Sequence, residues 1–296
     1  MKMQVWKLLF AWLVLVNLAV AELNVVATVP NMGMLAREIG GEAVQVRVMA
    51  PPDRDAHYLE ARPSMMAALR RADIVVSVGA ELEIGWLPAA IRGANNRRVQ
   101  PGQPGYFEAA AQVRLIGAGR PADRALGDVH PHGNPHIYLD PERLAVAGFA
   151  LAERFGELRP DEAEQFMAHA QRFAERVEAE MADLRVQAEG AKGVLLYHED
   201  ADYLLKALDV PIWGYIEPLP GIPPSASHLR SLVRSLEGEQ GVIWTMNFQP
   251  SNAGEFIGRE LGWRAVQLPS QVSATGTVDD YFAMIEAWVD TLEQAD

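Results

Sequence analysis

Short apolar runs alternate with amphipathic stretches over the first third of the chain. A nearly continuous β-branched run is typical of a parallel strand covered on both faces, whereas apolar residues three or four positions apart indicate a helix. This alternation favours a repeated β-α fold over a β-sandwich. The predicted strands are Leu23–Val29, Val44–Met49 and Asp73–Val78, and the predicted helices are Gly33–Ile39, Pro63–Ala72 and Glu83–Ile91.

The same alternation resumes after Gly190 and continues to the C-terminal region. Its β-α order predicts a second parallel sheet with helices on its faces. The predicted strands are Val194–Tyr197, Pro211–Tyr215, Val242–Met246 and Ala265–Leu268, and the predicted helices are Ala201–Leu208, Ser225–Leu236, Ala253–Leu261 and Val278–Leu292.

The middle of the chain has a different pattern, with two long helical stretches at Pro141–Phe155 and Pro160–Glu189. The second would be about 45 Å long at 1.5 Å per residue. Such a length favours a helix that joins two lobes, and heptad support for a coiled-coil seam is weak. We therefore expect an α/β fold with two Rossmann-like lobes, residues 22–140 and 191–296, around a helical segment at 141–190. Ligands of such sheets bind at the carboxyl ends of the strands, which here would face a cleft between the lobes.

Residues 1–21 have the pattern of a signal peptide. Lys2 and Lys7 precede an apolar run from Leu8 to Val16, and Ala19-Val20-Ala21 is a site of the type that signal peptidase cleaves. The apolar run is short for a membrane anchor, which needs about 20 residues. Since the chain has no cysteine, lipid attachment at a cysteine is excluded, and we expect a soluble periplasmic protein.

Composition narrows the possible chemistry. The formal net charge of −13 argues against binding to nucleic acid, which needs a basic surface. The absence of cysteine excludes disulfides, thiolate metal sites and thiol nucleophiles. Any transition-metal site must therefore be built from carboxylates and the seven histidines.

Three of these histidines occupy positions where a cleft site is expected. His57 follows the strand Val44–Met49, His136 precedes the helix that begins at Pro141, and His198 directly follows the strand Val194–Tyr197. Each alone could equally be a structural histidine, but together they predict a site for zinc, which binds neutral imidazole. His130 and His132 lie in the Gly- and Pro-rich loop 127–133, which is either a solvated loop or one that passes metal inward.

At these residues the chain resembles the periplasmic substrate-binding proteins of zinc and manganese ABC importers. Ala56–Ser64 is similar to the family's H-x-Y-E-x-x-P-S motif, and Asn134–Pro141 to N-P-H-x-W-L-D-P. Tyr197-His198 is a third match, and Glu217–Ser225 resembles the E-P-K-P-G-I-P-P-S signature of one branch. The resemblance spans essentially the whole chain after the signal peptide.

The resemblance implies a lobe–helix–lobe fold with a metal ion between the lobes, held by His57, His136 and His198. A histidine at position 198 favours zinc over manganese, because manganese prefers oxygen ligands. Many relatives add an aspartate from the loop that corresponds to Pro269–Gly276, and here that loop has no carboxylate. The candidates for a fourth ligand are therefore a water molecule, Glu199, Glu217, His130 and Asp279.

The implied function is capture of Zn(II) and its delivery to an ABC permease, by a monomer that is not an enzyme. A periplasmic metallochaperone is a further candidate partner. One alternative is an exported zinc hydrolase with Glu199 as general base, although the chain lacks H-E-x-x-H, and it also lacks the G-x-S-x-G of serine hydrolases. The other alternative is a metal-dependent adhesin.

Overall fold

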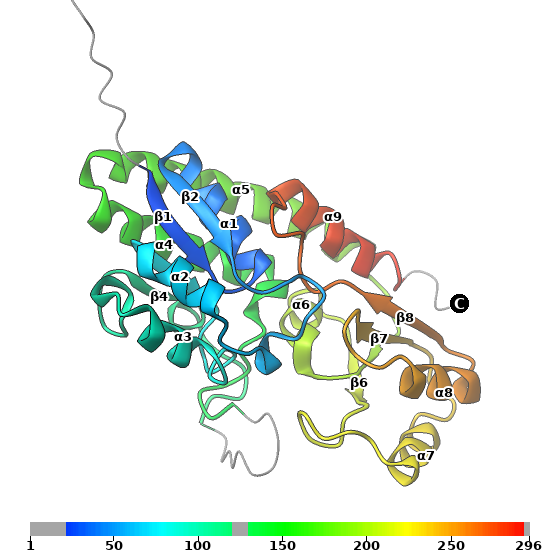
Figure 1. The fold of residues 1–296 in the computed structure, drawn as a ribbon. Helices are drawn as coiled ribbons and strands as arrows, with labels where there is room; N and C mark the ends of the chain where they lie inside the picture. The colour runs from blue at the N-terminus through cyan, green and yellow to red at the C-terminus, as the bar shows by residue number, and fades with distance from the viewer. Residues whose placement is uncertain (1–21, 120–129, 293–296) are drawn as a thin grey trace, which may run out of the picture.

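The computed structural model describes residues 22–119 and 130–292 of the 296-residue chain (Figure 1). The predicted signal peptide, residues 1–21, lies outside the described residues, as do residues 127–129 of the histidine-containing loop. Across the two described ranges, no helix is both long and apolar enough to cross a membrane.

Two four-stranded parallel sheets form the framework, with the same winding in each. The first has the order β2-β1-β3-β4 and the second the order β6-β5-β7-β8. The two-lobe α/β architecture expected from the sequence is confirmed. The strands are β1 Leu23–Ala27, β2 Val44–Val48, β3 Ile74–Ser77, β4 Tyr106–Glu108, β5 Val194–Leu196, β6 Ile212–Tyr215, β7 Val242–Met246 and β8 Arg264–Leu268.

Helices cover the sheets and connect the lobes. The long helices α4 and α5 lie between β4 and β5 in the chain, and they pack against each other. Helix α9, which follows the second sheet in the chain, packs on α1 and α5. The helices are α1 Pro30–Gly40, α2 Pro63–Arg71, α3 Leu87–Ala94, α4 Pro141–Leu158, α5 Ala163–Gln187, α6 Asp202–Ala207, α7 Ala226–Ser235, α8 Asn252–Leu261 and α9 Val278–Val289.

One cluster of buried apolar side chains extends through both lobes and includes Val76, Leu151, Phe173, Trp244 and Trp288. These residues belong to β3, α4, α5, β7 and α9, so the same core supports both sheets. Because the core is continuous, the lobe boundaries expected at residues 140 and 190 stay a prediction.

Local sequence signals explain where several helices begin and end. Proline occupies the first positions of α1, α2, α3 and α4, where its missing N–H is not needed. The Asp140 carboxylate accepts a hydrogen bond from the Arg143 N–H and caps α4. Helix α1 ends at Gly40, and the following Gly41 has φ +55°, a conformation that glycine adopts without strain.

Two predicted helices begin three or four residues later than expected. The helix expected from Pro160 begins only at Ala163, because Pro160–Glu162 form a separate 3₁₀ turn, and α5 has 25 residues, about 37 Å. The helix expected from Glu83 begins at Leu87. Here the buried Glu83 carboxylate accepts hydrogen bonds from Val78 and Gly79 N–H groups, which holds the preceding segment as a turn. The short edge strand β4 was not predicted.

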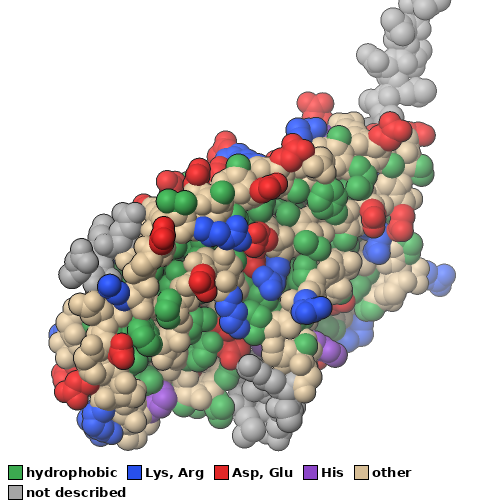
Figure 2. All heavy atoms as spheres, turned by 180° about the vertical axis from the view of Figure 1, so that it is seen from behind, with side chains coloured by type: hydrophobic (Ala, Val, Ile, Leu, Met, Phe, Trp, Pro, Cys, Tyr) green, Lys and Arg blue, Asp and Glu red, His purple; other side chains and the backbone are tan. Residues whose placement is uncertain are grey.

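Charged side chains of both signs are interspersed over the face seen in Figure 2. On this face, the described residues form no continuous basic patch of the kind that binds a phosphate backbone.

Candidate metal centre

His57 lies in a 3₁₀ turn, Ala56–Tyr58, in the loop that follows β2. The Asp55 carboxylate accepts hydrogen bonds from the backbone N–H of His57 at 2.9 Å and from its ring Nδ1 at 2.7 Å. Burial raises the pKa of Asp55, but the hydrogen bonds and charge of His57 outweigh it and lower the pKa overall. Asp55 is therefore an ionised acceptor, and Nδ1 of His57 carries the proton.

His136 is held in the same way by a neutral side chain. Oδ1 of Asn134 accepts hydrogen bonds from the backbone N–H and from Nδ1 of His136, both at 2.8 Å. The Asn134 amide also donates to the carbonyl of Glu199 at 2.8 Å, so it connects this loop to the second lobe. His136 is 1% exposed. Burial lowers the pKa of its ring well below 6.5, and the neighbouring histidines lower it further, so the ring is neutral.

His198 comes directly after β5, at the carboxyl end of the second sheet. Its Nδ1 is 2.9 Å from Oε2 of Glu217, and the same oxygen accepts from the Gly221 N–H at 2.9 Å. Burial opposes a positive charge on His198, but the carboxylates of Asp200, Glu217 and Glu199 overcome it and raise the pKa to about 9.

The structure brings these three histidines together, although they come from separate parts of the chain. One ring nitrogen from each of His57, His136 and His198 lies within 4.8 Å of the other two. Because Nδ1 of each ring faces an oxygen, Nε2 is the nitrogen left to face the centre. Nε2 of His136 and of His198 are buried, and neither has a hydrogen-bond partner among the described residues. Three convergent imidazole nitrogens suit a borderline dication such as zinc once they are deprotonated.

The residues expected as a fourth ligand differ widely in position. Glu217 lies behind the His198 ring, on Nδ1. Asp279 is a wrong candidate, because its carboxylate is 81% exposed and pairs with Arg176 of α5. Glu199 contacts the site loops through its backbone carbonyl. His130 lies beside the centre, with Nε2 at 3.1 Å from Nε2 of His57.

Asp200 also lies at the centre and was not predicted. Its Oδ1 is 3.7 Å from Nε2 of His136, and the residue is 2% exposed. The signal was its place two residues after His198, but in the sequence the adjacent Glu199 is an equally plausible carboxylate.

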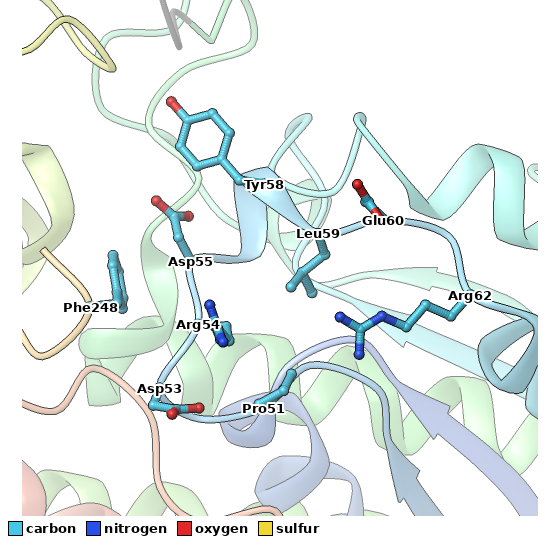
Figure 3. A pocket seen from close by; sticks show the side chains of 9 residues that line it. All are labelled: Pro51, Asp53, Arg54, Asp55, Tyr58, Leu59, Glu60, Arg62 and Phe248. Atoms are coloured by element: carbon cyan, nitrogen blue, oxygen red, sulfur yellow. The ribbon is translucent and has the colours of Figure 1, made fainter.

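The histidine cluster borders a cavity of about 230 Å³ that is lined by residues of both lobes, including His57, His198 and Asp200. A larger cavity of about 710 Å³ adjoins it and shares Asp55, Tyr58 and Phe248 (Figure 3). In Figure 3, Phe248 faces the loop with Asp55 across this space. The histidine cluster is thus reached through a cavity between the lobes.

His132 lies outside the cluster. Its side chain is 71% exposed, and its Nε2 is 4.0 Å from the Glu81 carboxylate. Of the predicted histidine-containing loop, His130 therefore contacts the centre, whereas His132 faces solvent.

Two parallel α/β lobes, long connecting helices and an interlobe histidine cluster define the class of metal-binding substrate-binding proteins, which are not enzymes. The family described as zinc-uptake complex component A, periplasmic (ZnuA) matches residues 25–295, and the chain belongs to this family. Substrate-binding proteins of ABC importers work with a membrane permease and an ATPase.

Individual relatives agree with this assignment. The chain is 26% identical to the high-affinity zinc uptake system protein ZnuA of Yersinia pestis over 241 residues, 76% of this chain and 75% of the relative. It is 23% identical to the iron-binding protein YfeA of the same organism over 288 residues, 91% and 85% of the two chains. A crystal structure of ZnuA has the same fold, with a TM-score of 0.74 at 20% identity over 91% of this chain and 98% of that one.

Proposed function

We propose that His57, His136 and His198 bind one Zn(II) ion through Nε2 and that the protein delivers this ion to the permease of an ABC importer. The observation that carries the proposal is the convergence of three ring nitrogens within 4.8 Å, two of them buried without a partner among the described residues. An unpaired buried polar atom is costly, and a bound cation would satisfy these nitrogens.

The oxygen partners of the Nδ1 atoms support a metal site. In metal-binding histidines, the N–H of the second ring nitrogen usually donates a hydrogen bond to a carboxylate or carbonyl oxygen, which fixes the tautomer and orients the ring. Asp55, Asn134 and Glu217 have this role at the three histidines. A shell of imidazoles favours zinc over manganese, and the family description also names zinc.

The proposal also covers export of the chain and its oligomeric state. The chain is exported with residues 1–21 as a signal peptide that is cleaved after Ala21, and it acts in the periplasm as a monomer. A periplasmic metallochaperone that loads the site is a further candidate partner.

The test is zinc binding by the mature protein, measured by competition with a chelating dye and by elemental analysis. We expect one zinc per chain, and His136→Ala should weaken binding at least tenfold, about 1.4 kcal/mol. His132→Ala is the matched control, because this exposed ring should leave the affinity unchanged. An unaltered affinity in His136→Ala would show that these histidines are not the ligands.

Delivery is tested separately. Zinc-loaded protein should bind its permease in detergent or nanodiscs more tightly than the zinc-free protein does. Hydrolysis of esters or peptides by the zinc-loaded protein would contradict the transport function.

A further inference from the structure

Asp200 is a buried carboxylate of the second lobe that lies beside the histidine cluster. It belongs to the 3₁₀ turn Glu199–Ala201, which follows His198 and precedes α6. Burying a carboxylate is costly unless its oxygens are paired with donors or a cation. Asp200 therefore needs partners, and its two oxygens differ in what they contact.

The Oδ2 oxygen of Asp200 is hydrogen-bonded within the protein. Oδ2 accepts a hydrogen bond from Nε2 of Gln249 at 2.7 Å, and the Gln249 amide oxygen in turn accepts from the Met246 N–H at the end of β7. This arrangement fixes the orientation of the carboxylate from behind, as the partners of metal ligands usually do.

The Oδ1 oxygen of Asp200 lies on the side of His136. Oδ1 is 3.7 Å from Nε2 of His136, which is too long for a hydrogen bond. Two ligand atoms of a tetrahedral zinc ion lie about 3.3 Å apart, because each is about 2.0–2.1 Å from the metal. The separation of Oδ1 and Nε2 is therefore close to one edge of a zinc tetrahedron.

The other residues near the centre are engaged differently. Glu217 is hydrogen-bonded to the far side of the His198 ring. Nε2 of His57 is 3.1 Å from Nε2 of His130, within hydrogen-bond distance. This hydrogen bond engages the nitrogen with which His57 would bind a metal, so zinc binding must break it.

We propose that Asp200 is the fourth zinc ligand, with Oδ1 bound to the ion and Oδ2 held by Gln249. This inference rests on the proposed function, which supplies the three histidine ligands. Four protein ligands leave no open position for an activated water, so the same shell that captures zinc excludes the hydrolytic chemistry of three-ligand sites. The one carboxylate also places a negative charge directly on the cation.

The test compares Asp200→Asn, which keeps the shape of the side chain, with Gln249→Ala and His130→Ala. Each variant is first checked for native folding by circular dichroism. Asp200→Asn should bind one zinc per chain about 100-fold more weakly, and Gln249→Ala about tenfold more weakly. His130→Ala should bind zinc at least as tightly as the wild type, because its hydrogen bond competes with the metal.

The cobalt-substituted protein gives a readout that stability alone would not change. The visible d–d spectrum should shift in Asp200→Asn, and X-ray absorption of the wild-type zinc protein should show three imidazoles and one carboxylate oxygen. An unchanged spectrum and affinity in Asp200→Asn, or a shell with four imidazoles, would overturn the assignment of Asp200. His136→Ala distinguishes the two proposals, because full zinc affinity in that variant would instead contradict the histidine site.

Discussion

Gln271, in the loop after β8, accepts a hydrogen bond at 2.9 Å from the backbone N–H of Asn31, 240 positions earlier in the chain. Asn31 is the second residue of α1 in the first lobe and is fully buried. Its side chain completes the connection, because it donates to the carbonyls of Tyr138 and Ser270 and accepts from the Val272 N–H. These bonds fix the loop after β8 of the second lobe to the first lobe.

Replacing Asn31 with alanine should destabilise the protein strongly. The change leaves two buried carbonyls and one buried N–H without their partner, and each such loss costs about 1–3 kcal/mol before relaxation. We expect the free energy of unfolding to fall by about 3 kcal/mol in urea denaturation. Gln165→Ala, an exposed change on α5, is the control and should stay within about 0.5 kcal/mol.

The same contacts predict little lobe movement when zinc is released. Opening the lobes as rigid bodies would break the bonds of Asn31 to the loop after β8 and the bond from Arg37 to the Gly276 carbonyl. We therefore expect release to proceed by movement of loops near the centre. Crystal structures of the zinc-bound and zinc-free protein would check this expectation, and a large rotation of one lobe against the other would contradict it.

Zinc affinity should depend on pH through His198. With a pKa of about 9, this ring is protonated at pH 7 in the zinc-free protein, and a protonated imidazole cannot bind metal. Zinc must therefore expel a proton, so the apparent affinity should rise about tenfold per pH unit from pH 7 to 8 and should fall toward pH 5. Calorimetry in buffers of different protonation enthalpy should detect about one proton released per zinc at pH 7. A flat profile from pH 5 to 8 would argue against this coupling.

Glu217→Gln should change both the affinity and this proton release. The carboxylate of Glu217 orients the His198 ring and contributes to its raised pKa. We expect zinc binding to weaken about 10- to 100-fold, and fewer protons to be released at pH 8 than by the wild type. Glu239→Gln, an exposed change on the second lobe, is the control that should alter neither quantity.

Removing zinc should lower the thermal stability. A ligand that binds only the folded chain adds about 2.7 kcal/mol when its free concentration is 100 times Kd. We expect a chelator to lower the Tm of the wild type, and zinc to restore it. In His136→Ala, at zinc concentrations that saturate the wild type, the increase should be much smaller, and an equal increase would point to binding elsewhere.

Much of the framework could be predicted from the sequence because its signals are local. The β-branched runs gave β3 and β7 to within a residue or two, and Pro141 marked the start of α4. Strand β4 was missed because it has only three residues, Tyr-Phe-Glu, and so short a pattern cannot be distinguished from a loop.

Site residues could be predicted from the sequence where they directly follow a strand. His57 and His198 follow parallel strands, whose carboxyl ends lie on one edge of each sheet. The place of Asp200 depends instead on how one 3₁₀ turn orients two adjacent carboxylates, and the bond between Asn31 and Gln271 depends on the packing of distant segments. Neither is encoded in a local pattern.

Helix α9, near the C-terminal end of the chain, packs against α1, near its N-terminal end. Its residues Ile285 and Trp288 are fully buried, and the helix packs on α1, which is formed by some of the first residues after the proposed cleavage site. The native surroundings of α1 are therefore incomplete until residues near the C-terminus have been synthesised. The chain therefore reaches its full stability only once helix α9 has docked on α1.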